Sequence, residues 1–318
     1  MKYFLVFTLF IVSISLNAQD VFSKGQMQKE QIDPTIYNIN DNIQGSLLVP
    51  DTLQPVPLVI FIAGQGAVDR NGNEPRTRSN HYKQLADSLL SKGIASYRYD
   101  KRTLTLMKNR KPTDEVTLNT FITDARVTVK TFNRDDRFSK IYLLGHGQGS
   151  LIAMRVYDES ISGVISIAGH GQSIDDLIVD QISKEIPGLD KVARATFDKI
   201  KKQEKPVKNI ERDLWNVANP GIQPFMKSWM KYDPTKLIKK IECPILLLNG
   251  DKNRQVSTMQ TELLHEASPS SKKVIITGMN YVFKKVGDDE IVAAKSYVEP
   301  NFPIHPELIS QVHTFVTE

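Results

Sequence analysis

The residues best placed to do chemistry surround three closely spaced glycines in residues 139–150, with the sequence SKIYLLGHGQGS. Strand-forming residues precede the glycines and an apolar helical pattern starts at Leu151, so the glycines mark a very tight strand-to-helix turn. In a turn of the type G-x-S-x-G, a nucleophilic serine is held at the centre in a strained backbone conformation. Here the central residue is Gly147, which has no side chain to attack a substrate. The sequence therefore predicts the frame of a nucleophile turn without the nucleophile.

The other nucleophiles, bases and acids lie at some distance from this centre. Ser150 carries the nearest hydroxyl, but it is three residues along the helix and should point away from position 147. His146 is interpreted as a packed residue of the turn, and His170 as a loop or pocket-wall residue. Asp251 follows a later strand and would supply an acid if its loop shifted. No cluster of His, Cys and carboxylates has metal-ligand spacing, so neither a metal nor another cofactor is expected.

The N-terminal segment has the pattern of a secretory signal peptide. One positive charge at Lys2 is followed by an apolar stretch that ends near Leu16, and the small residue Ala18 precedes polar residues. The apolar stretch is too short to span a bilayer comfortably, although an uncleaved membrane anchor is the rival interpretation. We expect residues 1–18 to be a leader. The remaining chain would then be exported to a periplasm or the extracellular space, without stable membrane insertion.

Charge and cysteine content exclude some classes of function. The formal net charge of +5 is small for 318 residues, which argues for solubility and against a nucleic-acid partner. Cys243 is the only cysteine, so an exported chain would have no intrachain disulfide. Stability must therefore come from a large hydrophobic core.

Strand and helix patterns alternate along most of the chain. Residues 35–39 and 43–49 predict an antiparallel hairpin, joined at Asp41-Asn42. The nearly continuous apolar run 56–63 is typical of a strand that is covered on both faces. Further strands are expected at 94–99, 141–144, 164–168, 245–248 and 273–277, with helical patterns between them. This rhythm predicts an α/β fold with a doubly wound, mostly parallel sheet, whose ligands lie beyond the carboxyl ends of the strands.

One long helical segment interrupts the alternation. Residues 170–236 contain no strand pattern and are too many for a simple crossover, so we expect an inserted helical cap above the strand ends. Residues 19–169 and 237–318 would form the core. Trp215 and Trp229 either line a pocket under this cap or belong to the cap's own core.

The order of these pieces resembles the α/β-hydrolase superfamily, and in particular secreted bacterial serine esterases and related peptidase-like hydrolases. The resemblance covers nearly all of the chain after the leader. It is carried by the first-loop motif IAGQG followed by DRNGN, by the segment RYDKR, by the glycine turn, by the helical cap and by two late strands with their loops. It implies the α/β-hydrolase fold and, for an intact member, ester or peptide hydrolysis.

The resemblance also locates three catalytic positions. The family has a nucleophilic serine at the centre of the turn, an acid after the penultimate strand and a histidine after the last strand. These positions correspond to Gly147, Asn253 and Tyr281, and none of them holds the expected group. A glycine cannot attack, a neutral amide cannot balance an imidazolium, and an ordinary tyrosine is a poor base at neutral pH. Catalysis by this triad is expected to be lost.

A binding site would survive that loss, because the oxyanion hole of this fold is built from backbone N–H groups. The corresponding groups are those of Gln148 and Gln65, and Gln148 also begins a helix whose N-terminus favours an anion. A small carboxylate or ester ligand is therefore one expectation, and a vestigial pocket filled by Tyr281 and water is the other.

Three functions remain open from the sequence alone. The first is an exported pseudo-hydrolase that binds a ligand or a partner protein. The second is an active ester hydrolase that uses a non-standard catalytic set, with Asp251 and His170 as candidates. The third is an assembly role in which the cap helices form the contact surface. Because function must be argued from a site and not from a fold, the degenerate triad favours the non-catalytic functions.

Overall fold

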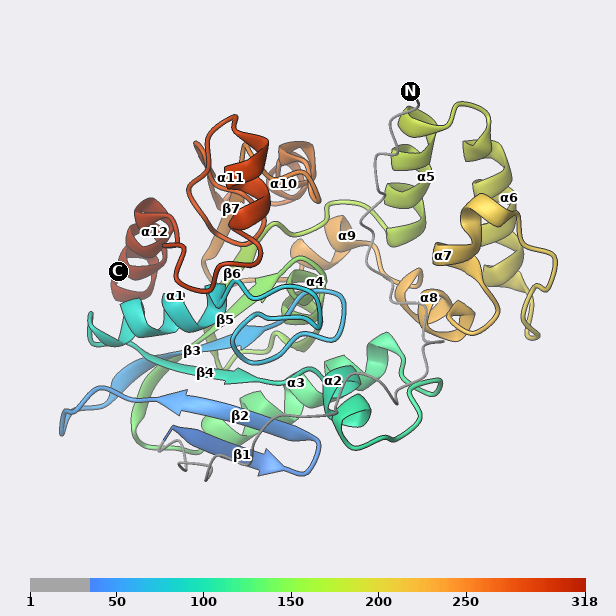
Figure 1. Ribbon diagram of the computed structural model, residues 1–318. Helices are drawn as coiled ribbons and strands as arrows, with labels where there is room; N and C mark the ends of the chain where they lie inside the picture. The colour runs from blue at the N-terminus through green and yellow to red at the C-terminus, as the bar shows by residue number, and fades with distance from the viewer. Residues whose placement is uncertain (1–34) are drawn as a thin grey trace, which may run out of the picture.

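The computed structural model describes residues 35–318, which form a mostly parallel sheet covered by helices on both faces (Figure 1). The predicted leader, residues 1–18, lies outside the described residues. The strands are β1 (Ile36–Asn40), β2 (Ile43–Leu48), β3 (Val56–Ile62), β4 (Ala95–Tyr99), β5 (Phe138–His146), β6 (Ile161–Ile167), β7 (Ile245–Gly250) and β8 (Lys272–Ile276). Within residues 35–318, no helix has the length and apolarity needed to cross a bilayer.

The sheet has the order β1-β2-β4-β3-β5-β6-β7-β8. β1 pairs antiparallel with β2, and β2 antiparallel with β4, whereas every later pair is parallel. The predicted hairpin at one edge and the predicted doubly wound, mostly parallel sheet are both confirmed.

The central strand β3 shows why the sheet is covered on both faces. Leu58 and Ile60 belong to one buried apolar cluster, and Val59 and Phe61 belong to a second cluster on the other face. Successive side chains of a strand point to opposite faces, so a continuous apolar run needs helices on both sides.

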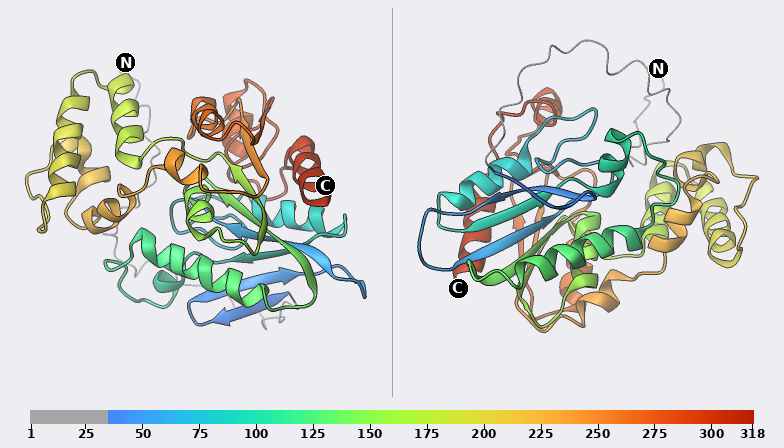
Figure 2. Two further views of the ribbon diagram at one scale, coloured as in Figure 1. Left: turned by 180° about the vertical axis from the view of Figure 1, so that it is seen from behind. Right: turned by 90° about the horizontal axis from the view of Figure 1, so that it is seen from below.

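The helices of the core divide between the two faces (Figures 1 and 2). α1 (His81–Leu90) and α12 (Pro306–Thr317) contact each other and contribute to the cluster that contains Val59. Helices α3 (Leu118–Phe132), α4 (Gln148–Val156), α9 (Pro234–Ile238) and α10 (Thr258–Ala267) form a contacting row whose apolar residues join the other cluster. Two short helices, α2 (Arg102–Lys108) and α11 (Glu290–Lys295), lie in connections.

The predicted insertion consists of helices that stand apart from the sheet at the right of Figure 1. They are α5 (Ile174–Glu185), α6 (Leu189–Lys202), the 3₁₀ helix η1 (Arg212–Leu214), α7 (Trp215–Ala218) and α8 (Gln223–Trp229). The boundary expected at residue 236 cuts through α9, which packs on α4 and α10. The insertion therefore ends a few residues earlier than the sequence suggested, because the short helix α9 belongs to the core.

A buried carboxylate joins the two longest helices of the insertion. Asp175 on α5 is fully buried, and its Oδ2 lies 2.5 Å from Arg194 Nη1 and 2.5 Å from Lys201 Nζ, both on α6. Burial alone would raise the pKa of Asp175, but the hydrogen bonds from Lys201 and Arg194 hold it below its ordinary value. The carboxylate therefore stays ionised and ties α5 to α6.

Candidate functional site

The glycine turn lies between β5 and α4, as predicted. The outer glycines are required for packing, since a Cβ on Gly149 would lie 2.0 Å from the carbonyl oxygen of Ile62 and one on Gly145 would lie 2.4 Å from that of Gly149. The central Gly147 has φ 51° and ψ −117°, a conformation that costs a residue with a Cβ about 1 to 3 kcal/mol. Ser150 points away from this centre and donates its hydroxyl to Gly145 O at 2.9 Å.

The place of a side chain at position 147 is occupied by Tyr281, from the loop that follows β8. A Cβ built on Gly147 would lie 2.6 Å from Tyr281 Oη and 3.0 Å from Gln65 Oε1. The tyrosine ring packs on His146, with ring centroids 4.2 Å apart. Burial raises the pKa of Tyr281 well above its ordinary value, so the phenol keeps its proton and cannot act as a base at neutral pH.

The expected oxyanion donor faces an acceptor of the protein itself. The backbone N–H of Gln148 donates to Gln65 Oε1 at 3.4 Å, and the Tyr281 hydroxyl donates to the same oxygen at 3.4 Å. The sequence predicted Gln65 through its backbone N–H, whereas the structure shows its side-chain oxygen in this position. An incoming anion would have to displace that amide.

Asn253 has a structural role in the loop after β7. Its Nδ2 donates to Asn249 Oδ1 at 2.8 Å, and its Oδ1 accepts the backbone N–H groups of Gln255 and Val256, both at 3.0 Å. The side chain is 9% exposed. No hydrogen bond joins it to Tyr281 among the described residues, so the two residues predicted for the acid and base positions do not form a pair.

Asp251 does not compensate for Asn253. Its Oδ1 accepts the backbone N–H of Gly278 at 2.6 Å, which ties the loop after β7 to the loop after β8. The residue is exposed and is absent from the wall of the cavity that contains His170. The structure thus does not bring together the two residues of the alternative catalytic set.

His146 is packed within the turn, as the sequence indicated. It is 1% exposed, and its Nδ1 lies 2.8 Å from Tyr82 Oη. Burial lowers the pKa of His146 to about 3, so the ring is neutral at physiological pH. Within residues 35–318, no three His, Cys, Asp or Glu side chains gather in a way that would hold a metal ion.

The sequence did not single out a buried lysine, Lys101, and a partly buried glutamate, Glu74, beside the glycine turn. Lys101, which follows β4, donates to the carbonyl oxygen of Gly64 and to Gln148 Oε1 at 2.7 Å, and its Nζ lies 4.4 Å from the centroid of the Phe121 ring. Burial lowers the pKa of Lys101 to about 7, against the opposing influence of Glu74. Burial raises the pKa of Glu74 to about 7, although the positive charge of Lys101 acts to lower it. Lys101 positions the first loop and the start of α4.

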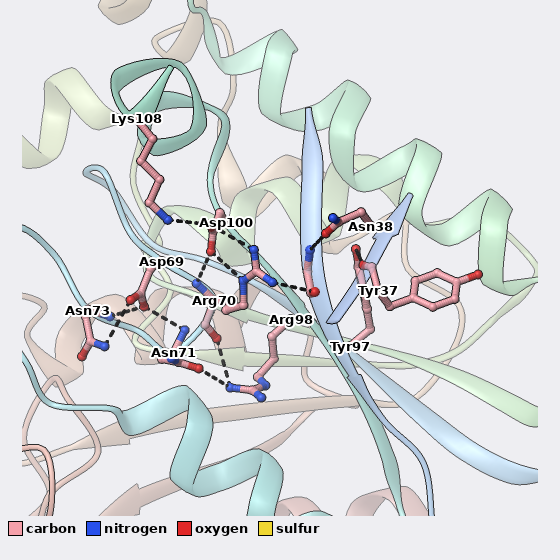
Figure 3. A network of polar contacts seen from close by, with 11 residues as sticks. Tyr37, Asn38, Asp69, Arg70, Asn71, Asn73, Tyr97, Arg98, Asp100 and Lys108 are labelled. Carbon is pink, nitrogen blue, oxygen red and sulfur yellow. Dashed lines mark hydrogen bonds and ion pairs between the residues drawn. The ribbon is translucent and has the colours of Figure 1, made fainter. Parts of the chain in front are cut away.

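A polar network holds the first loop, which supplies Gln65, against the sheet (Figure 3). Asp69 accepts the backbone N–H of Asn71 at 2.8 Å, which closes a tight turn. Arg70 Nε lies 3.0 Å from Asp100 Oδ1, and Asp100 is 2% exposed. Burial opposes the ionisation of Asp100, but the hydrogen bond and charge of Arg70 hold its pKa below the ordinary value. The loop is therefore preorganised around a buried carboxylate.

A cavity of about 850 Å³ lies next to the glycine turn, between α5, the loop after β7 and the segment around α11. His170 and Trp229 form part of its wall, with ring centroids 6.1 Å apart and an interplanar angle of 23°. Gln65 also lines it, whereas Gly147, Gln148, Asn253 and Tyr281 do not.

The two tryptophans of the insertion have different roles. Trp229 is 4% exposed; it lines the cavity and also belongs to the buried apolar cluster. Trp215 is 48% exposed and does not line it. The expectation that Trp215 lines the pocket is corrected, because α7 presents this ring to solvent.

Known proteins share this sequence pattern and this architecture. A family model described as serine aminopeptidase, S33, matches residues 76–279, which is well over half of the chain. The chain is 26% identical over 240 residues to Esterase EstD of Thermotoga maritima; the match covers 74% of the chain but only 56% of that relative. The chain therefore spans about half the length of this curated relative.

Two solved structures are similar in fold. Est1E from Butyrivibrio proteoclasticus has a TM-score of 0.57 at 17% identity, over 89% of this chain and 99% of that one. DcsB in complex with its substrate analogue has a TM-score of 0.53 at 12% identity, over 86% of this chain and 94% of that one. These likenesses agree with the sheet order and show the fold. The family-model match over residues 76–279 shows that the chain belongs to the serine aminopeptidase S33 family of α/β hydrolases.

Proposed function

We propose that this protein is an exported, catalytically inactive member of its esterase-like family that binds a small molecule in the cavity beside the glycine turn. The proposal is carried by one observation. The Tyr281 hydroxyl lies 2.6 Å from where a Cβ at position 147 would be, so a phenol fills the space that a nucleophile needs. Export rests on the signal-peptide pattern of residues 1–18.

The described side chains offer no replacement for the missing triad. Asp251 is bound to the backbone of Gly278 and lies outside the cavity wall that contains His170. Burial lowers the pKa of His170 to about 4, so it is neutral at physiological pH but has no carboxylate partner to orient it. Lys101 is 5% exposed and its amine is bound by two acceptors. Each group lacks either access or a partner.

The expected carboxylate or ester ligand would not bind at the oxyanion position of the glycine turn. The donor that would bind its oxygen, the N–H of Gln148, already faces Gln65 Oε1. The cavity, by contrast, has a volume within the range of about 300–1,000 Å³ that is usual for ligand pockets. We therefore place the ligand in the cavity and not at the turn.

The test is turnover of short-chain nitrophenyl esters by the purified protein, compared with heat-denatured protein. A serine-directed phosphonate probe is applied in parallel, and an active esterase serves as the positive control. We expect hydrolysis at background and no labelling by the probe. Enzymatic turnover above background would overturn the assignment as inactive, and its loss in a His170→Ala variant would then support the alternative catalytic set.

A further inference from the structure

We infer that the cavity takes an uncharged, polyhydroxylated ligand of the carbohydrate class, held by side-chain amides against an aromatic wall. This inference deepens the proposed function and rests on it. It concerns only the residues that line the cavity, so it can fail while the protein remains a ligand-binding pseudo-hydrolase.

Charges on the cavity wall cancel, which argues against an ionic ligand. Arg254 Nη2 lies 3.3 Å from Glu290 Oε1, and Lys252 Nζ lies 2.5 Å from Asp288 Oδ1. Both pairs are largely exposed and contribute little energy, so the argument rests on the balance of charge around the cavity. Lining cations and anions are equal in number: Lys184, Lys252 and Arg254 against Asp180, Glu185 and Glu290.

Six residues of the cavity wall carry neutral amides, as many as carry charges. A side-chain amide has both donors and an acceptor, as a hydroxyl group does, so a wall of amides matches a ligand rich in hydroxyls. The amide residues that line the cavity are Gln65, Gln172, Gln181, Gln255, Gln260 and Asn280.

Two polar residues of the wall have unused hydrogen-bonding capacity. Gln255 uses its Oε1 to accept the Tyr297 hydroxyl at 3.0 Å, which leaves its NH₂ group available. His170 is 8% exposed and lines the cavity, and neither of its ring nitrogens has a hydrogen-bond partner among residues 35–318. The NH₂ group of Gln255 and the ring nitrogens of His170 can therefore bind hydroxyl groups of a ligand in the cavity.

The aromatic wall supplies the complementary apolar surface. The rings of His170 and Trp229 are stacked, and Leu177 and Leu263 line the cavity with them. Because burial lowers the pKa of His170 to about 4, the ring is uncharged at neutral pH and provides one donor and one acceptor. A sugar ring has the matching character: hydroxyls around its edge and apolar C–H groups on its faces.

The experiment measures binding by ligand-observed NMR and calorimetry with the intact protein. The probes are neutral hexose and pentose mono- and disaccharides, with glucuronate and octanoate as charged comparators. We expect a neutral saccharide to bind with little dependence on salt, and glucuronate to bind at least about tenfold more weakly, which corresponds to about 1.4 kcal/mol. Failure of the whole neutral panel to bind, or tighter binding of a charged comparator, overturns the inference.

Variants test whether binding occurs in this cavity. Trp229→Ala and Gln181→Ala should each weaken saccharide binding about tenfold or more, since each removes a wall contact. Trp215→Ala is the matched control, because this tryptophan is exposed and outside the cavity wall. Gln181→Ala changes a partly buried helix residue and is expected to fold even if Trp229→Ala does not. Unchanged affinity in Gln181→Ala and Trp229→Ala would place binding elsewhere and contradict the inference. Ester turnover is measured separately, and only turnover bears on the proposed loss of catalysis.

Discussion

At the scale of single residues, the contact between Gly147 and Tyr281 determines what the glycine turn can do. The distance of 2.6 Å from a Cβ at position 147 to Tyr281 Oη is too short for any side chain unless the tyrosine moves. The next tyrosine atom, Cζ, is 3.6 Å away, which is an ordinary contact. The shortest contact therefore involves the tyrosine hydroxyl, with Gln65 Oε1 second at 3.0 Å, and a conservative substitution can isolate the contribution of the hydroxyl.

We expect Gly147→Ser to destabilise the protein without creating esterase activity. Positive-φ strain and overpacking together should lower the free energy of unfolding by roughly 2 to 5 kcal/mol. Urea denaturation measures this loss, and nitrophenyl ester turnover measures activity. In a Tyr281→Phe background the same serine should cost less, because the nearest ring atom is then the one at 3.6 Å. Equal costs in the two backgrounds, or turnover by the single variant, would contradict this explanation.

The sequence predicts that catalytic groups are absent but not which contacts take their place. The resemblance assigns the triad positions to Gly147, Asn253 and Tyr281 from residue order alone, which needs no coordinates. The position of the Tyr281 hydroxyl over the turn depends on how the loop after β8 folds back, and no local pattern encodes that path. Lys101 and Glu74 were overlooked for the same reason, since their burial is a property of the assembled loops.

At the scale of secondary-structure elements, the insertion is held together by side chains from neighbouring helices. The carboxylate of Asp175 on α5 receives both Arg194 and Lys201 of α6. The side chain of Asp176, the next residue, is 54% exposed and contacts Arg194 but not Lys201. The helix pair thus contains a buried ionic contact and an exposed one at adjacent positions.

This pair of positions allows a matched comparison. Asp175→Asn should lower the free energy of unfolding by roughly 1.5 to 3 kcal/mol, because charged hydrogen bonds to a buried acceptor are lost. Asp176→Asn should cost less than about 1 kcal/mol, since exposed ion pairs contribute little. Hydrogen exchange would locate the effect, with faster exchange in α5 and α6 than in the strands. Uniform acceleration throughout the chain would argue against a role confined to the insertion.

Elements with a strong apolar pattern were predictable, and those without one were not. The run in β3 indicated a strand buried on both faces, and α3 showed regular apolar spacing. By contrast, α11 has no buried residues and α9 has only five residues, so neither carries a periodic signal that a sequence can display. The misplaced end of the insertion follows from the same lack of pattern in α9.

At the scale of the whole molecule, buried titratable groups should shape how stability depends on pH. Burial lowers the pKa of His146 to about 3 and that of His170 to about 4, whereas burial raises the pKa of Glu74 to about 7. A histidine with a lowered folded pKa stabilises the protein above pH 6.5, and this contribution is lost as the pH falls through the folded value. Glu74 acts in the opposite direction: its contribution to the stability of the protein is present below pH 4.5 and is lost as the pH rises to about 7.

We expect His170→Gln to be less sensitive to acid than the unmodified protein. Between pH 7 and pH 4, the histidine makes folding less favourable by on the order of 3 kcal/mol, because the unfolded chain binds a proton that the folded chain does not. Urea midpoints across this range should fall less steeply in the variant. His313→Gln, on α12 and only partly buried, is the matched control. Parallel pH profiles for the unmodified protein and His170→Gln would show that His170 does not carry the effect.

The phenol over the glycine turn also sets an order in which changes can be made to this chain. Serine introduced first is expected to lower stability, whereas trimming Tyr281 opens the space at the cost of a contact with His146. Directed evolution that starts from this chain and selects for ester cleavage one codon at a time should therefore stall. A library that varies positions 147 and 281 together would avoid the barrier.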